Sequence, residues 1–330
     1  MKKRILILFL ALALLLTGCA KPAPTAAAQA PVAATSAPAA TEAPAAETAV
    51  PQATATEGVK LTDMMGRSVT LAAPAKQIVA LTAADCEILY AIGAGDAVIA
   101  RGEYCNYPES ALALPAVASG NETNLEAILA LSPDAVVMGT MSQSEEQIAA
   151  LEKAGIAVVV SDADTIAGVY ETITMLGTLT GHEKEAAAVS EDMRARFEAL
   201  KAKAPQGEKT SVYFEVSPLE WGLWAAGKGT FMDEIAEMLH LSNIFSDVDG
   251  WVEVSEEQVL SRNPDVIVTT TMYYGEGPTP TEEVLLRTGW QNVAAVVNNR
   301  VFNADSDAVT RPGPRLADAA EALYAFIYGG

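Results

Sequence analysis

Two segments of this chain repeat one another, and the repeat constrains the fold more than any other feature. Residues 124–137 read NLEAILALSPDAVV and residues 256–268 read EEQVLSRNPDVIV. Matched positions, such as Glu126 and Glu257, differ by 131 in residue number throughout. In each copy we expect a short helix to end, Pro-Asp to turn the chain and an apolar strand to begin, because proline cannot continue a helix. The repeat therefore predicts two similar lobes.

From residue 58 onward, short apolar runs alternate with longer segments of helical spacing. The runs are rich in β-branched residues, which is typical of buried parallel strands, whereas the longer segments place apolar residues three and four positions apart. This alternation predicts α/β lobes with parallel sheets. The expected strands are 77–81, 97–101, 134–138 and 156–160 in the first half, and 211–216, 265–270 and 300–304 in the second. The expected helices are 84–94, 144–155, 231–241, 255–262 and 315–328.

Residues 165–204 are expected to form one long helix between the lobes. Apolar residues recur at threes and fours along this stretch, and Pro205 comes only after its end. A bend or an interruption would fall near Gly181, since glycine is a poor helix former. The predicted organisation is an N-terminal α/β lobe over 58–164, a linking helix over 165–204 and a C-terminal α/β lobe over 205–330.

The first 57 residues indicate export and anchoring. Residues 1–18 combine a basic start with an apolar run that is shorter than the roughly 20 residues needed to span a bilayer, which is typical of a signal peptide. The small residues before Cys19 resemble a bacterial lipobox, in which the cysteine is lipidated and becomes the mature N-terminus. Residues 19–57 are nearly all Ala, Pro, Thr, Glu and Gln, and so predict a disordered tether that cannot bury enough apolar surface to fold.

Charge and cysteine placement exclude several classes of protein. The chain has 21 Lys and Arg against 42 Asp and Glu, a formal charge of −21, so nucleic acid is not an expected partner. Cys86 falls in a predicted helix and Cys105 in a predicted loop, without a C-x-x-C motif or clustered histidines, so no metal site is expected. An exported protein would tolerate a Cys86–Cys105 disulfide, which the sequence leaves open.

No catalytic pattern is evident. Residues 222–229 approach a phosphate-binding loop but end in glycine, so the Ser or Thr that would bind magnesium is missing. With two histidines in the chain, acid–base chemistry would rest on carboxylates, and none forms an evident pair. The chain is therefore not expected to be an enzyme or to carry a cofactor of its own. A structural adhesin would explain the tether but not the duplicated lobes.

These features together resemble one family, the substrate-binding lipoproteins of ABC importers for cobalamin, siderophores and haem. The resemblance covers residues 58–330 and implies a ligand cleft between the lobes. In that family each lobe presents a glutamate that docks onto arginines of the membrane permease, and Glu126 and Glu257 occupy the matching places. The helix dipole also favours an acid in a first helical turn, so their position alone has a structural explanation.

Within the family, the cobalamin-binding members are most similar. Tyr104 and Tyr107 resemble their Y-x-x-Y-P loop, Trp251 matches a pocket tryptophan six positions before Glu257, and Asp307-x-x-x-Arg311 resembles their acid and arginine near the C-terminus. One departure is that Gly120 stands where those proteins have a second tryptophan. Further aromatic residues in predicted loops suit a large amide-fringed ligand, which needs apolar faces and a few oriented polar groups. The expected ligand-binding residues are Tyr104, Tyr107, Trp221, Trp224, Trp251, Tyr273, Asp307 and Arg311.

The resemblance implies an extracytoplasmic, lipid-anchored monomer that captures a corrinoid for an ABC permease and its ATPase. A ferric siderophore is the alternative, although its frequent negative charge would call for several basic residues, and only Arg311 with Arg101 or Lys228 nearby is evident. Haem is less expected, because axial ligation needs a suitable side chain in the pocket and His182 and His240 fall in predicted helices.

Overall fold

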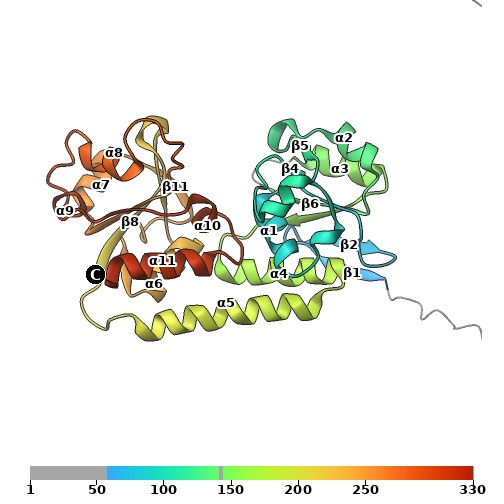
Figure 1. Ribbon diagram of the computed structural model, residues 1–330, viewed down its shortest axis with the longest axis horizontal. Helices are drawn as coiled ribbons and strands as arrows, with labels where there is room; N and C mark the ends of the chain where they lie inside the picture. The colour runs from blue at the N-terminus through green and yellow to red at the C-terminus, as the bar shows by residue number, and fades with distance from the viewer. Residues whose placement is uncertain (1–57, 141–143, 330) are drawn as a thin grey trace, which may run out of the picture. The chain divides into compact units, whose positions relative to one another are not determined.

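The computed structural model of the chain describes residues 58–140 and 144–329, and Figure 1 shows its two lobes. The N-terminal lobe is built on a parallel sheet with strand order β5-β4-β3-β6-β7, preceded by the antiparallel hairpin β1-β2. The strands are β1 (Val59–Thr62), β2 (Ser68–Leu71), β3 (Ile78–Ala80), β4 (Val98–Gly102), β5 (Ala116–Val117), β6 (Ala135–Gly139) and β7 (Ala157–Ser161). The helices are α1 (Ala83–Ala91), α2 (Leu125–Leu131), α3 (Glu145–Lys153) and α4 (Ile166–Thr180).

The C-terminal lobe has a mixed sheet with strand order β11-β9-β8-β12-β13, and β10 also pairs with β8. Strands β8, β10, β12 and β13 are parallel, whereas β9 and β11 run antiparallel at one edge. The strands are β8 (Thr210–Ser217), β9 (Leu223–Ala226), β10 (Leu241–Asn243), β11 (Trp251–Val254), β12 (Val266–Thr269) and β13 (Val301–Asn303). The helices are α5 (Glu183–Lys203), α6 (Phe231–Met238), α7 (Glu256–Arg262), α8 (Pro280–Leu286), α9 (Ala294–Val297), α10 (Ser306–Thr310) and α11 (Leu316–Tyr328).

The sequence repeat is a structural repeat. Helices α2 and α7 occupy equivalent positions, and each ends in a left-handed residue, Ser132 with φ 48° and Asn263 with φ 44°. The aspartate of each Pro-Asp turn then holds the backbone before the neighbouring strand. Asp134 accepts the Gln77 amide at 2.9 Å, and Asp265 accepts the Ser211 amide at the same distance. The Pro-Asp echo is thus explained by strand alignment within each lobe.

The prediction of one continuous helix over 165–204 is wrong, because the segment forms two helices, but the interruption falls at Gly181, near which the sequence placed it. Helix α4 ends at Gly181, whose φ of 74° is left-handed, and α5 begins at Glu183 and runs back along α4. Gly177 permits this return, since a Cβ atom there would lie 2.6 Å from the Cβ of Ala186. Helix α5 alone leads into the C-terminal lobe, while α4 packs in the N-terminal lobe (Figure 1).

Two smaller expectations also need correction. The helix expected over 231–241 ends at Met238, because His240 adopts a left-handed φ of 56° and the chain then enters β10. Trp224 and Trp251, expected in loops, are in the antiparallel strands β9 and β11. Both strands are short, and glycines at 222 and 250 flank them, which made the segments resemble turns.

One apolar core continues from lobe to lobe. It includes Ile88 of α1 and Leu176 of α4 together with Phe231 of α6 and Leu316 of α11, all of them buried. Each sheet has a further apolar cluster on its other face. Among the helices that the structure describes, none is long and apolar enough to cross a membrane.

Candidate ligand-binding site

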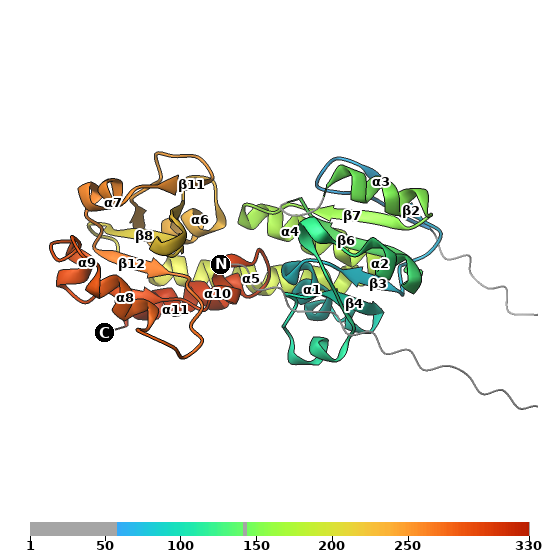
Figure 2. The ribbon, with the colours of Figure 1, turned by 90° about the horizontal axis from the view of Figure 1, so that it is seen from above.

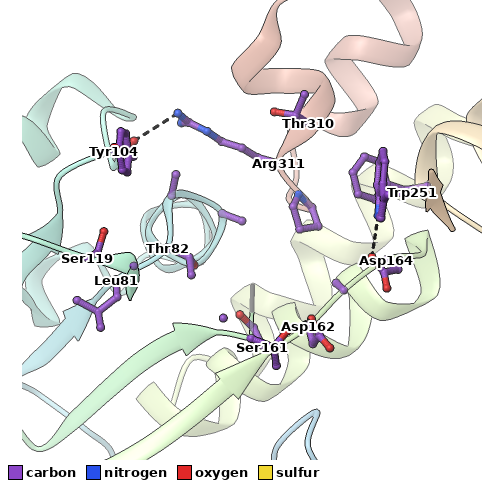
Figure 3. A pocket seen from close by; sticks show the side chains of 18 residues that line it. Leu81, Thr82, Tyr104, Ser119, Ser161, Asp162, Asp164, Trp251, Thr310 and Arg311 are labelled. Carbon is purple, nitrogen blue, oxygen red and sulfur yellow. Dashed lines mark hydrogen bonds between the residues drawn. The ribbon is translucent and has the colours of Figure 1, made fainter. Parts of the chain in front are cut away.

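A cavity of about 350 Å³ lies between the lobes. Its N-terminal side is formed where parallel strands end, at Thr82 after β3, Thr140 after β6 and Ser161 at the end of β7. Ligands of open α/β sheets commonly bind at the carboxyl ends of the strands, where loops converge. The C-terminal side contributes Phe231 and Pro312. It also contributes Trp251, Thr310 and Arg311, which Figure 3 labels.

Two aromatic side chains lie on opposite sides of this cavity (Figure 3). Trp251 is fixed from two directions. Its indole Nε1 donates to Asp164 Oδ1 at 3.0 Å, and its ring packs against Phe231 with a centroid distance of 5.2 Å. Tyr104, in the loop after β4, is 70% exposed, so its ring stands at the rim. The pair offers one ordered and one accessible apolar face to a ligand.

The rest of the lining is rich in hydroxyl and carboxyl groups. They come from both the N-terminal lobe and the end of α10, and Asp162 and Asp164 are exposed. Groups of this kind accept and donate hydrogen bonds, which suits a ligand fringed with amides. The polar members are Thr82, Ser119, Thr140, Ser161, Asp162, Asp164 and Thr310.

A buried carboxyl group lies directly beneath this lining. Asp85 is 0% exposed, and its Oδ2 accepts hydrogen bonds from the hydroxyls of Thr82 and Ser161, the latter at 2.7 Å. Its Oδ1 is buried and has no protein partner. Burial raises the pKa of Asp85 to about 6, against the lowering effect of the two hydroxyl hydrogen bonds. The floor of the cavity is therefore sensitive to pH.

Replacing Asp85 by asparagine is expected to change how stability depends on pH. Because the pKa of Asp85 is higher in the folded than in the unfolded protein, ionisation disfavours folding as the pH rises from about 4 to 6. Relative to wild type, Asp85→Asn should gain about 3 kcal/mol in free energy of unfolding between pH 4 and pH 8. Urea denaturation at both pH values measures this, with the exposed Asp96→Asn as a control. Parallel curves for wild type and Asp85→Asn would contradict the prediction.

The guanidinium of Arg311 reaches the cavity but is already bonded to protein. Its two Nη atoms donate to Glu87 at 2.7 Å, Asn106 at 2.7 Å, Asp307 at 2.6 Å and the Tyr104 carbonyl at 3.3 Å. Asp307 also accepts the Asn106 amide at 2.8 Å and does not line the cavity. The acid and arginine expected to touch ligand are thus brought together, and they lie in a network that spans the two lobes.

The remaining aromatic candidates lie away from this cavity. Tyr107 packs under Arg315, whose Cζ is 4.4 Å from the ring centroid. Trp221 is 77% exposed in a turn before β9, and Trp224 on β9 pairs with Glu253. Tyr273 lines a separate cavity of about 380 Å³ in the C-terminal lobe. The structure therefore brings Tyr104, Trp251 and Arg311 together, but not these four.

Several lining residues were missed by sequence reasoning. Ser161, Asp162 and Asp164 directly follow the predicted strand 156–160, and Thr82 follows the predicted strand 77–81. Their position after parallel strands was a usable signal, because those strand ends meet at one edge of a sheet. Phe231 carried no such signal, since it begins a helix of the other lobe.

The two expected docking glutamates are exposed in matching positions. Glu126 lies in the first turn of α2 and Glu257 in the first turn of α7. Both helices lie on the side of their lobes that faces away from α5 (Figure 1). The arrangement offers one carboxylate from each lobe on a common side of the protein.

The structure also bears on the cysteines and on metal binding. Cys86 and Cys105 are buried free thiols, so the disulfide that the sequence left open is not formed in this structure. Hydrogen bonding to Cys105 and burial raise the pKa of the Cys86 thiol, which keeps it protonated. Cys19 lies outside the described residues. Within residues 58–140 and 144–329, no cluster of His, Cys, Asp or Glu is arranged to hold a metal ion.

Comparison with known proteins assigns the chain and its fold to a family. The family model for periplasmic binding proteins matches residues 78–308. The chain belongs to the periplasmic binding protein family. This family has a substrate-binding role in transport, which confirms the expectation that the chain is a binding protein and not an enzyme. The two α/β lobes with a site between them agree with that assignment.

Individual relatives narrow the class. The chain is 35% identical over 283 residues to YvrC of Bacillus subtilis, described as an uncharacterized ABC transporter substrate-binding lipoprotein, covering 84% of this chain and 88% of the relative. The solved vitamin B12 binding protein BtuF of Vibrio cholerae is 27% identical with a TM-score of 0.64, covering 77% and 96%. A possible iron-binding protein from Staphylococcus epidermidis is 29% identical with a TM-score of 0.66, covering 77% and 99%. These proteins place the chain in the cobalamin, siderophore and haem class of substrate-binding proteins.

Proposed function

We propose that this protein is the lipid-anchored, extracytoplasmic binding subunit of an ABC importer, and that it captures a corrinoid and delivers it to the permease and its ATPase. The names of two similar proteins, a substrate-binding lipoprotein and a vitamin B12 binding protein, support this role. The lipobox at Cys19 supports the anchor. The observation that carries the corrinoid assignment is the pairing of Tyr104 and Trp251 across a cavity lined by hydroxyl and carboxyl groups.

The charge of the cavity favours a neutral or cationic ligand. Among the described residues that line it, Arg311 is the basic one, and Glu87 and Asp307 already neutralise its charge. Asp162 and Asp164 add negative charge at the wall. A corrinoid, which is neutral or weakly charged and fringed with amides, meets these conditions. An anionic ferric siderophore would be repelled.

The size of the cavity sets how such a ligand would lie. Small-molecule sites range from about 300 to 1,000 Å³, so a cavity of about 350 Å³ is at the lower end. A ligand as large as a corrinoid would extend past the exposed ring of Tyr104 toward solvent. Tyr104 would then pack against one face of the ligand while Trp251 contacts the deeper part.

A ferric siderophore is the second candidate, because the similar Staphylococcus epidermidis protein is described as possibly iron-binding. Arg101 and Lys228 do not assist Arg311 in binding an anion. Arg101 is buried and donates to backbone carbonyls, including that of Ala111 at 3.1 Å, and Lys228 does not line the cavity. A neutral or cationic siderophore is therefore the form that this alternative requires. For haem, Tyr104 is the one potential axial ligand among the described lining residues.

Substituting Trp251 tests the site directly. Trp251→Ala should weaken cyanocobalamin binding about 30-fold, because a buried aromatic contact is worth about 2 kcal/mol. Trp224→Ala removes a tryptophan from the same lobe outside the cavity, and should bind as wild type does. Isothermal calorimetry on the three proteins provides the comparison. Equal loss in both variants, or in neither, would count against this cavity as the corrinoid site.

A further inference from the structure

The turn between α10 and α11 reaches from the C-terminal lobe onto α1 of the N-terminal lobe (Figures 1 and 2). Gly313 in this turn is buried, and a Cβ atom there would meet Ala84 and Ile88 of α1 at 3.9 Å. Arg311 and Arg315 lie on either side of Gly313 in the sequence. The turn thus brings two positively charged side chains of the C-terminal lobe against the N-terminal lobe, beside the cavity.

A single carboxylate of α1 receives both arginines. The Glu87 side chain is 2% exposed, and its Oε1 accepts from Arg311 at 2.7 Å and from Arg315 at 3.3 Å. Its Oε2 is buried and has no protein partner. A buried carboxylate of this kind is costly unless it is paired, so the two arginines are held to it firmly.

The same two arginines hold the loop that carries Tyr104. Arg311 donates to the Tyr104 carbonyl and to Asn106 Oδ1, while Arg315 stacks on the Tyr107 ring. Together with the bonds to Glu87 and Asp307, these bonds use four of the five N–H donors of the Arg311 guanidinium. Arg311 therefore has little capacity left for direct ligand contact, and its main effect falls on the loop.

We propose that Glu87 is a positioning residue for ligand binding: through Arg311 and Arg315 it fixes the 104–107 loop, and thereby sets the place of Tyr104 at the rim of the cavity. This inference rests on the proposed function for its effect on a ligand. The contacts themselves do not depend on which ligand is bound. Glu87 should therefore affect ligand affinity through the contact that Tyr104 makes with the ligand.

A double-mutant cycle separates this role from a general structural one. In the full chain purified in detergent, Glu87→Gln should weaken cyanocobalamin binding about tenfold, because a site loosened at its supporting residues loses affinity. In a Tyr104→Ala background, the same change should have no further effect on the dissociation constant. A purely structural role predicts an equal fold-change in both backgrounds. Asp247→Asn is the control, since it removes an ion pair with Arg262 outside the cavity.

A second measurement tests, in the absence of ligand, whether Glu87 fixes the 104–107 loop. Hydrogen exchange of the amides at 103–107 should become about tenfold faster in Glu87→Gln than in wild type, and unchanged in Asp247→Asn. If exchange is faster in Glu87→Gln but the wild-type protein does not bind corrinoids, the positioning role of Glu87 is supported and the proposed function is refuted. Unchanged exchange in Glu87→Gln, or additive effects on affinity, would overturn the positioning role. Arg315→Gln provides a second variant if Glu87→Gln does not fold.

Discussion

Changing both Glu126 and Glu257 to lysine is expected to abolish ligand uptake by cells while leaving ligand affinity unchanged. The two side chains are exposed at equivalent positions of α2 and α7, remote from the residues that line the cavity. If they dock onto permease arginines, reversing their charge replaces attraction with repulsion, and unfavourable charge pairs at an interface cost several kcal/mol. Uptake of radiolabelled cobalamin should therefore fall at least a hundredfold.

A matched control isolates position from net charge. Glu146 lies in the first turn of α3 and Glu185 in the first turn of α5, and both are exposed. Their double change to lysine alters the net charge by the same amount and should leave uptake intact. Normal uptake by the Glu126→Lys/Glu257→Lys protein would refute docking through these residues. Loss of ligand affinity in that protein would show that the substitutions act elsewhere.

The largest effect on stability is expected for Arg287→Met. The Arg287 guanidinium binds both carboxylate oxygens of Glu215, at 2.6 and 2.8 Å, and their side chains are 2% and 0% exposed. Glu283 completes the site at 2.5 Å. Removing the cation leaves the buried Glu215 carboxylate unpaired, and such losses cost about 3–5 kcal/mol.

Urea denaturation at pH 7 measures this loss of stability. Repeating it at lower pH tests whether the unpaired Glu215 carboxylate is the cause. Burial raises the pKa of Glu215 while Arg287 lowers it, so without the arginine the carboxyl takes up a proton more readily and the cost should shrink toward pH 4. Lys201→Met removes a cation from an exposed pair with Glu198 and should change stability by less than about 1 kcal/mol. A loss at Arg287→Met no larger than this control would contradict the assignment.

The lobes could be predicted from sequence because their signals are local. The repeat located α2 and α7 in register, and the β-branched runs located the parallel strands of both sheets except β5 and β10. The sequence placed an interruption near Gly181 but did not predict that α5 folds back along α4, because glycine stops a helix only weakly on its own. The effect of Gly181 depends on Gly177, which lets α5 pack closely against α4. The hairpin β1-β2 and the strands β9 and β11 are too short, at four residues each, to give a strong pattern.

Family likeness supplied Tyr104, Trp251 and Arg311, and the ends of the predicted parallel strands could have supplied part of the remaining lining. Tyr104, Trp251 and Arg311 reach the cavity from segments far apart in the chain, and no local pattern brings them together. The bond between Trp251 and Asp164 joins residues 87 positions apart, so spacing alone gives no sign of it. Likeness also assigned Arg311 to the ligand, whereas the structure shows it bonded to Glu87, a partner visible only once the lobes are packed.

The most direct test of the account is a titration of the purified full chain with a panel of ligands. Cyanocobalamin and cobinamide would be compared with neutral and anionic ferric siderophores and with haemin, following tryptophan fluorescence and confirming stoichiometry by calorimetry. The expected result is saturable one-to-one binding of the corrinoids and none of the anionic siderophores. Binding of a siderophore or haemin in the absence of corrinoid binding would contradict it.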